Sequence, residues 1–225
     1  MLQDSHVIPN FIFKPLRAPG GSMVHVNVDD WKVEKNSDSH SEFLLCEDCE
    51  GKISKWEDHG ARRLRDLSAF DQKPENEILW TGFDYAQFKL FQLSVLWRAG
   101  VAKGPFFEAV SLGPLGENIR RKLLANDPGE VDFCGCIMTG ILTEWARSDG
   151  FVYAPQLARH KGRYYYNFIF AGVLWIFSAN QSAEREMIQW FLQKNGSVPL
   201  VFMDVKDLPN AASVLSIIAK NYRST

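Results

Sequence analysis

The chain has 225 residues, of which 46% are hydrophobic, so it can form a substantial core, and a disordered protein is excluded. Its 25 lysine and arginine residues nearly balance 27 aspartate and glutamate residues. The total charge therefore does not indicate a nucleic-acid-binding protein, and any such site has to be a local patch.

Residues 1–70 are mostly polar, with short apolar stretches in HVIPNFIF and MVHVNV on either side of Pro19-Gly20-Gly21. This pattern predicts a small, loop-rich module with one or two strands. The segment ISKWEDHGARRLRDL predicts a helix over residues 53–67, with Ser54 as its N-cap, although Gly60 disfavours a helix there.

The strongest local signal predicts a helix over residues 84–99. Asp84 and Gln87 form a capping-box pattern at its start, and Gly100 predicts its end. Apolar residues occupy almost all of its faces, so we expect it to be buried at the centre of the core. Two shorter helices are predicted over residues 105–112 and 114–126, the second opened by Pro114.

From about residue 133 the chain consists of short aromatic and β-branched segments with glycines between them, which is typical of antiparallel strands. These segments are FCGCIMTGILTEWA, GFVYAP, YYYNFIFA, VLWIFSA and VPLVFMDV. Helices are expected over residues 183–195 and in NAASVLSIIAKNYRS. The fold class is therefore α+β: a small module in residues 1–70, and a domain in residues 71–225 with a helical middle and an antiparallel sheet with helices at the C-terminus.

The first residues, MLQDSHVIPN, lack the basic start, apolar centre and small-residue cleavage site of a secretory signal, which predicts a cytoplasmic protein. The longest apolar run, residues 168–179, is about 12 residues long, whereas a membrane-spanning helix needs roughly 20. We therefore expect no membrane span and interpret this run as a buried hairpin. In a reducing compartment, the four cysteines are expected to be thiols or metal ligands rather than disulfides.

Cys46 and Cys49 form a C-x-x-C pair, whose two sulfurs can bind one zinc ion from a single turn. A complete structural site needs four ligands, and the other two cysteines are Cys134 and Cys136. One interpretation is a four-thiolate zinc site that joins the two parts of the chain. Alternatively, Cys134 and Cys136 are core residues and other ligands complete the site. A separate possibility is that Cys46 and Cys49 are thiols in a turn and carry no metal.

The chain has five histidines, which differ in their sequence surroundings. His25 and His160 are expected to be solvated or hydrogen-bonded. His59 is expected to face solvent, with metal binding beside the cysteine pair as the alternative. His6 precedes Val7-Ile8 and Pro9, and the proline keeps the chain extended, so the imidazole is expected at the end of a strand, a rigid place for a general base.

The segments DSHVIPNF and LLCEDCE together resemble the HNH family, the ββα-metal nucleases, in which a strand with a histidine is followed by a cysteine-pair turn that leads into a helix. These segments, with DYAQFKLFQLSVLWRAGV and LGPLGENIRRKLLANDPG, also resemble a group of uncharacterised bacterial proteins of similar length. The resemblance implies that residues 1–70 form a ββα-metal-like module.

In the HNH family the histidine activates water for attack on a phosphodiester, and its neighbours hold a divalent ion. The resemblance implies that His6 is the catalytic base and that Glu50 is the second catalytic residue, which binds Mg or Mn. The acid that precedes the histidine in the family is Ser5 here, a poor ligand, so Asp4 is the expected replacement. The central asparagine position falls near Ser41. The expected metal ligands, including zinc ligands at the cysteine pair, are Cys46, Cys49, Glu50, Asp4 and His40.

The resemblance implies an HNH-like hydrolase that cleaves nucleic acid in bacterial antiviral defence, with a protein partner in a defence complex. The basic segments GARRLRD and IRRKLLAN are candidates to approach phosphates, or else form solvated helix faces. Because the chain lacks the acid before His6 and the upstream C-x-x-C of the family, the alternative is a non-catalytic module with a degenerate ββα fold that binds a partner. The two hypotheses differ on whether His6 lies near an acid or in apolar surroundings.

Overall fold

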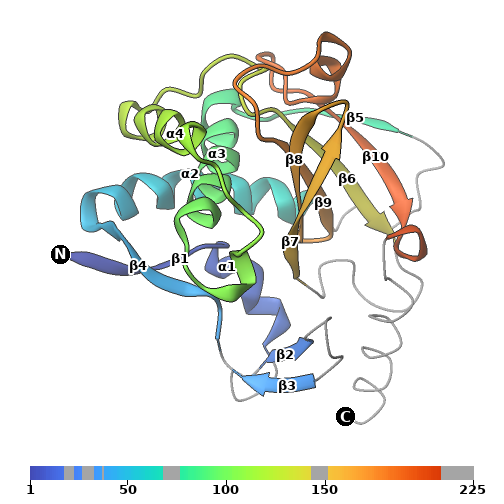
Figure 1. The fold of residues 1–225 in the computed structure, drawn as a ribbon. Helices are drawn as coiled ribbons and strands as arrows, with labels where there is room; N and C mark the ends of the chain where they lie inside the picture. Colours follow the sequence, from blue (N-terminus) through green and yellow to red (C-terminus); the bar gives the residue numbers. More distant parts are fainter. Residues whose placement is uncertain (18–22, 27–32, 37, 68–76, 143–151, 209–225) are drawn as a thin grey trace.

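The computed structural model describes residues 1–17, 23–26, 33–36, 38–67, 77–142 and 152–208, which form a mixed α+β fold (Figure 1). The strands are β1 (Leu2–His6), β2 (Met23–Val26), β3 (Val33–Asn36), β4 (Ser41–Cys46), β5 (Ile78–Trp80), β6 (Cys136–Leu142), β7 (Tyr153–His160), β8 (Arg163–Phe170), β9 (Val173–Ser178) and β10 (Val198–Asp204). The α-helices are α1 (Asn10–Phe13), α2 (Glu47–Leu67), α3 (Tyr85–Val101) and α4 (Pro114–Ala125), and short 3-10 turns lie at Lys14–Leu16, Pro105–Phe107, Arg185–Trp190 and Val205–Asp207.

The largest sheet has the strand order β5-β10-β6-β9-β8-β7. Its neighbouring strands are antiparallel except for β6 and β10, which are parallel with Leu200 opposite Met138. The predicted antiparallel sheet is therefore mixed. The physical reason is that the connection 179–197 passes the end of β6, so β10, which runs opposite to β9, pairs on the far side of β6 and is therefore parallel to it.

The buried hairpin predicted over residues 168–179 is confirmed. Strands β8 and β9 pair antiparallel, with Phe170 opposite Val173. The two turn residues, Ala171 and Gly172, have φ angles of 52° and 72°, as the tight turns that match strand twist require.

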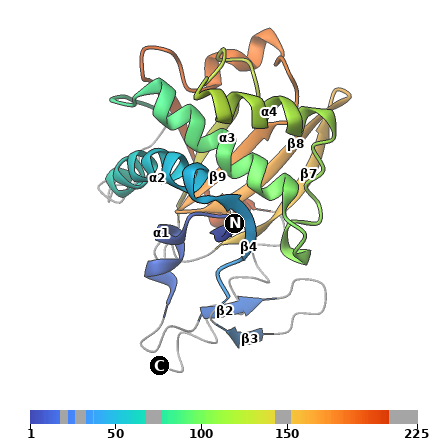
Figure 2. The same ribbon diagram turned by 90° about the vertical axis from the view of Figure 1, so that its left-hand side faces the viewer.

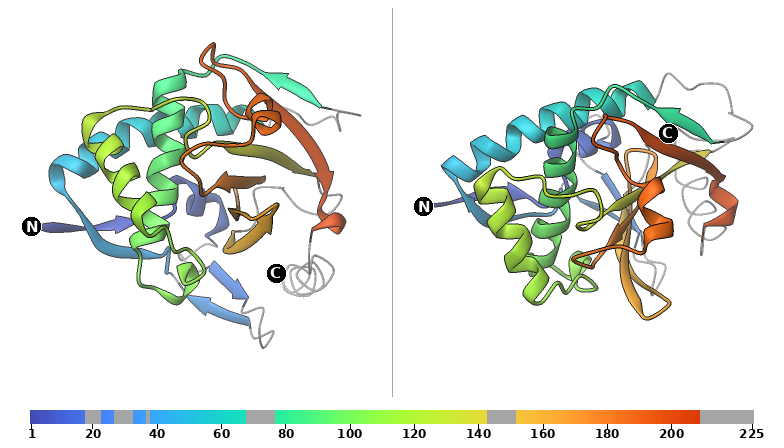
Figure 3. Two further views of the ribbon diagram at one scale, coloured as in Figure 1. Left: turned by 45° about the horizontal axis from the view of Figure 1, so that its top comes forward. Right: turned by 90° about the horizontal axis from the view of Figure 1, so that it is seen from above.

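Helices α2, α3 and α4 cover one face of the large sheet (Figures 2 and 3). The central helix is α3, in which most side chains are buried, as its sequence predicted. Its predicted cap is also present, because the Asp84 carboxylate accepts a hydrogen bond from the Gln87 backbone N–H at 3.0 Å. This helix therefore links the sheet to α2, which follows the N-terminal strands.

Two glycines that suggested helix breaks instead allow close packing. A Cβ atom at Gly60 would lie 3.0 Å from the Phe91 ring, and α2 continues through this position to approach α3. A Cβ atom at Gly100 would lie 2.4 Å from the Leu112 side chain, and α3 continues to Val101. Absence of a side chain, rather than backbone freedom, explains both glycines.

In the N-terminal part, β1 pairs antiparallel with β4, and β2 pairs antiparallel with β3. Helix α2 begins at Glu47, immediately after β4, rather than at the predicted start near Ile53 with Ser54 as cap. The prediction was wrong because the residues after Cys46 are polar and were assigned to a turn. The cysteine pair consequently lies at the start of a long helix.

Side chains from both predicted parts belong to one hydrophobic core, which includes Val7, Ile8, Trp56, Phe88 and Trp175. The predicted boundary near residue 70 lies outside the described residues. The N-terminal strands and α2 therefore pack directly on the helix that carries the rest of the core.

Two predicted helices are much shorter than expected. The segment 105–112 contains a 3-10 turn at Pro105–Phe107, and the segment 183–195 contains one at Arg185–Trp190. In the second segment the Gln193 side-chain amide donates to the carbonyls of Ile188 and Phe191, both at 2.8 Å, and thereby takes the place of backbone donors that a continued helix would supply. The C-terminal helix predicted in residues 210–224 lies outside the described residues.

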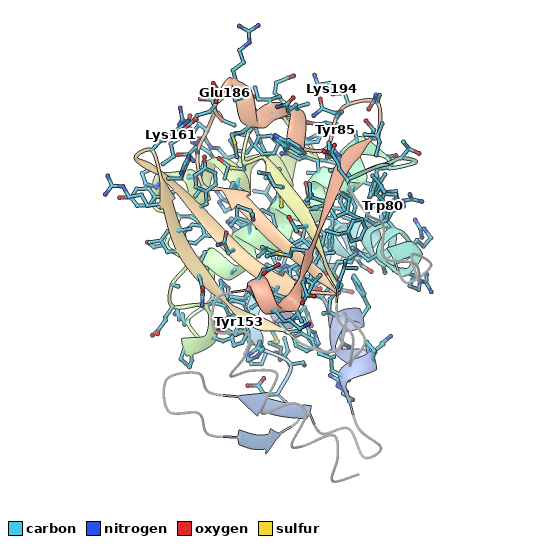
Figure 4. The ribbon with its side chains drawn as sticks, turned by 90° about the vertical axis from the view of Figure 1, so that its right-hand side faces the viewer. Trp80, Tyr85, Tyr153, Lys161, Glu186 and Lys194 are labelled. Atoms are coloured by element: carbon cyan, nitrogen blue, oxygen red, sulfur yellow. The ribbon has the colours of Figure 1, made fainter. Side chains whose placement is uncertain are left out.

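Figure 4 looks onto the face of the sheet opposite the helices, with Tyr153 toward one end of the strands and Lys161 and Glu186 toward the other. The Lys161 Nζ atom lies 4.0 Å from Oε2 of Glu186, and such exposed ion pairs stabilise a fold by at most about 1 kcal/mol. Within the described residues, no helix is long and apolar enough to cross a membrane.

Candidate active site

His6 is the last residue of β1, at the strand end that its sequence predicted, and lies opposite Ser41 of β4. The next residue, Val7, donates its backbone N–H to the carbonyl of His40 at 3.1 Å, so the pairing extends past the imidazole. The His6 Nε2 atom lies 2.9 Å from Ser39 Oγ. Both strands therefore hold the half-buried ring in place.

The pKa of His6 is lowered from its ordinary value, chiefly because burial disfavours the charged imidazolium. The carboxylates of Asp4 and Glu50 act in the opposite direction, and the cations of Arg17 and Arg98 lower the pKa further. Within the described residues the Nδ1 atom makes no hydrogen bond. The ring is therefore neutral near pH 7, and in the tautomer whose Nε2–H donates to Ser39 Oγ the Nδ1 atom is able to accept a proton.

Arg98 of α3 connects three elements at this point. Its Nη1 atom donates to the His6 carbonyl at 2.6 Å and lies 2.7 Å from Oε1 of Glu57 in α2. Its Nε atom donates to the Ser94 carbonyl at 3.2 Å. Because Arg98 is only 2% exposed, this guanidinium is a fixed link between β1, α2 and α3.

The contact between Arg98 and Glu57 is an ion pair without hydrogen-bond geometry, and in the described part of the chain Glu57 Oε1 is buried with no hydrogen-bond partner. Burial raises the pKa of Glu57, and the charge of Arg98 opposes that rise. A buried carboxylate depends on such a cation, since the desolvation cost of an unpaired charge is large. The pair therefore has a structural role next to His6.

Glu50 lies in the first turn of α2. Its Oε1 atom is buried and has no hydrogen-bond partner among the described residues. Its charge acts on both His6 and Glu57. Glu50 and Glu57 are two helical turns apart and thus share one face of α2. That face places the Glu50 carboxylate within electrostatic reach of the imidazole and the Glu57 carboxylate on Arg98.

The two residues before His6 take different roles. Asp4 is exposed, and its charge raises the pKa of His6, so it lies within electrostatic reach of the ring. Ser5 is buried, and its hydroxyl donates to the Gln3 carbonyl at 3.2 Å and accepts the Leu45 N–H at 3.2 Å. Ser5 therefore completes the irregular pairing of β1 with β4, and Asp4 is the acid next to the imidazole.

His40 lies in aromatic surroundings. Its ring stacks on Phe106 with centroids 4.0 Å apart, and it meets the edge of Phe107 at 5.8 Å. The structure therefore groups His6, Asp4 and Glu50, whereas the His40 ring packs against the turn that follows α3.

Cys46 is exposed and directly precedes α2, and Cys49 lies half-buried in the first turn of that helix. The Cys46 sulfur receives hydrogen bonds from the backbone N–H groups of Cys49 and Asp48 and from the Cys49 thiol, and these lower its pKa. Burial, followed by the contact with Cys46, raises the pKa of Cys49. The Cys46 sulfur therefore caps the start of α2.

Cys49 also borders a small apolar cavity of about 40 Å³ between α2, α3 and α4. Side chains of Ile53, Trp56, Trp97 and Leu124 line the same space. One sulfur of the pair thus faces solvent, and the other borders an apolar space.

In the described part of the chain, no group of three or more histidine, cysteine, aspartate or glutamate side chains is placed to hold a metal. Cys134 and Cys136 are buried beside Lys89, and the charge of that lysine acts on both thiols. Zinc at Cys46 and Cys49 stays a prediction. Magnesium needs fewer protein ligands, since it usually takes one or two carboxylates together with water and substrate phosphates. A Mg or Mn ion at Glu50 and Asp4 likewise stays a prediction.

Sequence reasoning missed Ser39, Glu57 and Arg98. One signal was present: Arg98 is a charged residue in a helix that is predicted to be buried on almost all faces. Glu57 gave no such signal, because the helix was predicted to begin at residue 53 and Glu50 was not placed on one face with it. Ser39 has no comparable signal, because its contact with His6 depends on how the intervening residues return to β1.

No protein family, curated protein or solved structure matches this chain. The resemblance to HNH nucleases therefore rests on the short motifs around His6 and the cysteine pair.

Proposed function

We propose that this protein is an HNH-like, metal-dependent nuclease that hydrolyses phosphodiester bonds of nucleic acid. One observation carries the proposal: β4 runs directly into α2, and this connection brings Glu50 within electrostatic reach of His6 at the end of β1. A neutral, held imidazole beside carboxylates is what a metal-assisted phosphodiesterase needs.

In this proposal His6 is the general base. Its Nδ1 atom accepts the proton of the attacking water, while the protonated Nε2 atom donates to Ser39 Oγ, 2.9 Å away. Arg98 holds the His6 backbone through the carbonyl at 2.6 Å, so the ring keeps its position as the proton moves. Arg17, which is half-buried, adds positive charge beside His6, which favours the approach of a phosphate.

Mg or Mn would be held by Glu50, with Asp4 as the second carboxylate. The buried Glu50 Oε1 atom, which lacks a partner among the described residues, fits a cation ligand, since a buried carboxylate oxygen is otherwise costly. When bound, such an ion stabilises the charge on the leaving oxygen of the phosphodiester. The proposed setting in bacterial antiviral defence, the protein partner and the cytoplasmic location depend on the sequence alone.

The first test is His6→Ala, assayed by nicking of supercoiled plasmid DNA and cleavage of single-stranded RNA with Mg or Mn. We expect a loss of about 100-fold or more, the usual contribution of a general base. The matched control is His160→Ala, which removes an exposed imidazole at the end of β7 and should leave cleavage unchanged.

Glu50→Gln preserves the size of the side chain but removes its charge, and we expect it to raise the metal concentration needed for half-maximal cleavage. Unchanged cleavage by His6→Ala, or none by the unmodified protein with any divalent metal, would remove the mechanism. Nucleic-acid binding without cleavage would favour the alternative, a non-catalytic module.

A further inference from the structure

The cysteine pair at the start of α2 has no part in the hydrolysis proposed above. Cys46 directly precedes α2 and Cys49 is the third residue of that helix, and in helix geometry Cα atoms three residues apart lie about 5 Å apart. Disulfides span Cα separations of roughly 4.4 to 6.8 Å. The Cys49 thiol hydrogen-bonds the Cys46 sulfur, so the two sulfurs lie close together.

The two sulfurs differ in accessibility. Cys46 is exposed to solvent, whereas Cys49 is half-buried and borders the apolar cavity beneath the first turn of α2. A reagent from solvent therefore reaches Cys46 first. Two backbone N–H groups donate to the Cys46 sulfur and hold it at the start of α2.

The other two cysteines lack these features. Cys134 is 0% exposed and Cys136 is 1% exposed. Their neighbour Lys89 is also buried, so the surroundings of both thiols are closed to solvent. They serve as internal controls for reactions of the exposed pair.

We propose that Cys46 and Cys49 form a reversible dithiol–disulfide site that exchanges with low-molecular-weight disulfides. Cys46 is the attacking cysteine, and Cys49 is the resolving cysteine. The partner is a small disulfide because a small reagent reaches an exposed sulfur at a helix start without a docking surface. The proposal does not depend on the nuclease function.

The exchange proceeds in two balanced steps. The Cys46 thiolate attacks one sulfur of a disulfide RSSR, which breaks the RS–SR bond, forms a Cys46–SR bond and releases one RS⁻. Cys49 then gives its proton to solvent and attacks the Cys46 sulfur, which forms the Cys46–Cys49 bond and releases the second RS⁻. The protein loses two electrons, and RSSR gains them to become two thiols after protonation.

The test uses the reduced full-length protein with oxidised and reduced glutathione at a series of fixed ratios. After an acid quench, free thiols are alkylated in denaturant and located by peptide mass mapping. We expect loss of two of the four alkylatable thiols, both in the segment with Cys46 and Cys49, with a midpoint that follows the glutathione ratio. Cys134 and Cys136 should stay reduced throughout.

Two matched variants assign the roles. In Cys49→Ser the resolving step is lost, so glutathione should accumulate on Cys46 as a mixed disulfide. In Cys46→Ser the first step is lost, so neither glutathione nor a disulfide should appear in this segment. Far-UV circular dichroism and thermal unfolding show whether each variant keeps its fold, and the unmodified protein provides the disulfide readout without any substitution.

Three results would overturn the proposal. The first is a pair that stays fully reduced in oxidised glutathione alone. The second is glutathione on Cys49 of the Cys46→Ser variant together with none on Cys46 of the Cys49→Ser variant. The third is one equivalent of zinc in the purified protein that protects both sulfurs from alkylation, because the pair would then be a metal site.

Discussion

Helix α3 carries two buried cations in two different environments. Lys89 lies toward its start and faces the sheet, and Arg98 lies near its end and faces α2 and β1; they are 1% and 2% exposed. Arg98 contacts the Glu57 carboxylate at 2.7 Å. Lys89 donates only to the carbonyls of Cys134 and Val131, at 3.2 and 3.5 Å, and forms no ion pair with the described residues.

The difference shows two ways in which a core tolerates a cation. Arg98 keeps its charge, because a guanidinium does not deprotonate in proteins, and the charge is matched by Glu57. Among the described residues Lys89 has no carboxylate partner, and burial lowers its pKa to about 8, although the nearby Cys134, Cys136 and Asp132 oppose that change. Arg98 holds the backbone of His6 in the candidate active site, whereas Lys89 makes the stability of the fold depend on pH.

We expect the largest effect on stability from removal of Glu57, the carboxylate that forms an ion pair with Arg98. Glu57→Ala leaves a buried guanidinium without a counter-charge, and we expect it to lower the free energy of unfolding by about 3 kcal/mol. Denaturant unfolding monitored by tryptophan fluorescence measures the change. The control is Asp58→Ala, an exposed acid on the next residue of α2, for which we expect less than about 0.5 kcal/mol. Equal losses would mean that Arg98 is compensated by something other than Glu57.

Lys89→Met should have a smaller effect with the opposite sign. The difference between the ordinary pKa of 10.5 and about 8 corresponds to roughly 3 kcal/mol against burial of the charged lysine. Loss of the hydrogen bond to Cys134 offsets about 1 kcal/mol of this, so we expect a net gain of about 2 kcal/mol at pH 7.

The pH dependence separates this explanation from simple repacking. Below about pH 8 Lys89 is protonated in both states, so the unmodified protein bears the full cost of the buried charge. Between about 8 and 10.5 the folded state has lost the proton and the unfolded state still binds it, so stability rises with pH. The advantage of Lys89→Met should therefore shrink across this window, measured as the difference between the unfolding free energies of the two proteins.

The unfolding free energies of the unmodified protein and Lys89→Met must be compared at each pH, because the buried thiols change stability with pH in the opposite direction. Burial raises the pKa of Cys134 to about 12 and that of Cys136 still further, so above pH 9 the unfolded state loses protons that the folded state keeps. Both proteins share this loss of stability. An advantage of Lys89→Met that stays constant from pH 7 to about pH 10 would contradict the assignment of the lowered pKa to Lys89.

The sequence predicted features that depend on neighbouring residues. The cap at Asp84, the opening of α4 at Pro114 and the hairpin around Gly172 follow from local hydrogen bonding and backbone geometry, and the structure confirms them. The position of His6 at a strand end has the same origin, because Pro9 limits the conformation of the residues before it. Local rules were sufficient for these elements.

Features that depend on distant partners could not be predicted. The same residues of β10 could pair in either direction, and the parallel pairing with β6 is decided by the path of residues 179–197. The ion pair of Arg98 with Glu57 joins two helices, and the sequence shows only that each contains a charge. Local polarity also hid the start of α2, where Cys46 itself supplies the capping acceptor. The position of His6 at a strand end was therefore predictable, but the helical position of Glu50 and the contacts of Arg98 were not.

The smallest effect is expected at the helix start nearest Lys89. Asp84→Ala removes the acceptor for the Gln87 N–H, and loss of a cap of this kind lowers stability by about 1 kcal/mol. Asp84→Asn keeps an oxygen in place and should cost much less. Because the charges that act on Lys89 are those of Cys134, Cys136 and Asp132, the loss of stability caused by Asp84→Ala should be the same on both sides of the pH window in which that lysine titrates. A cap effect that changes with pH as the effect of Lys89→Met does would mean that the start of α3, rather than Lys89 alone, sets the pH response of the core.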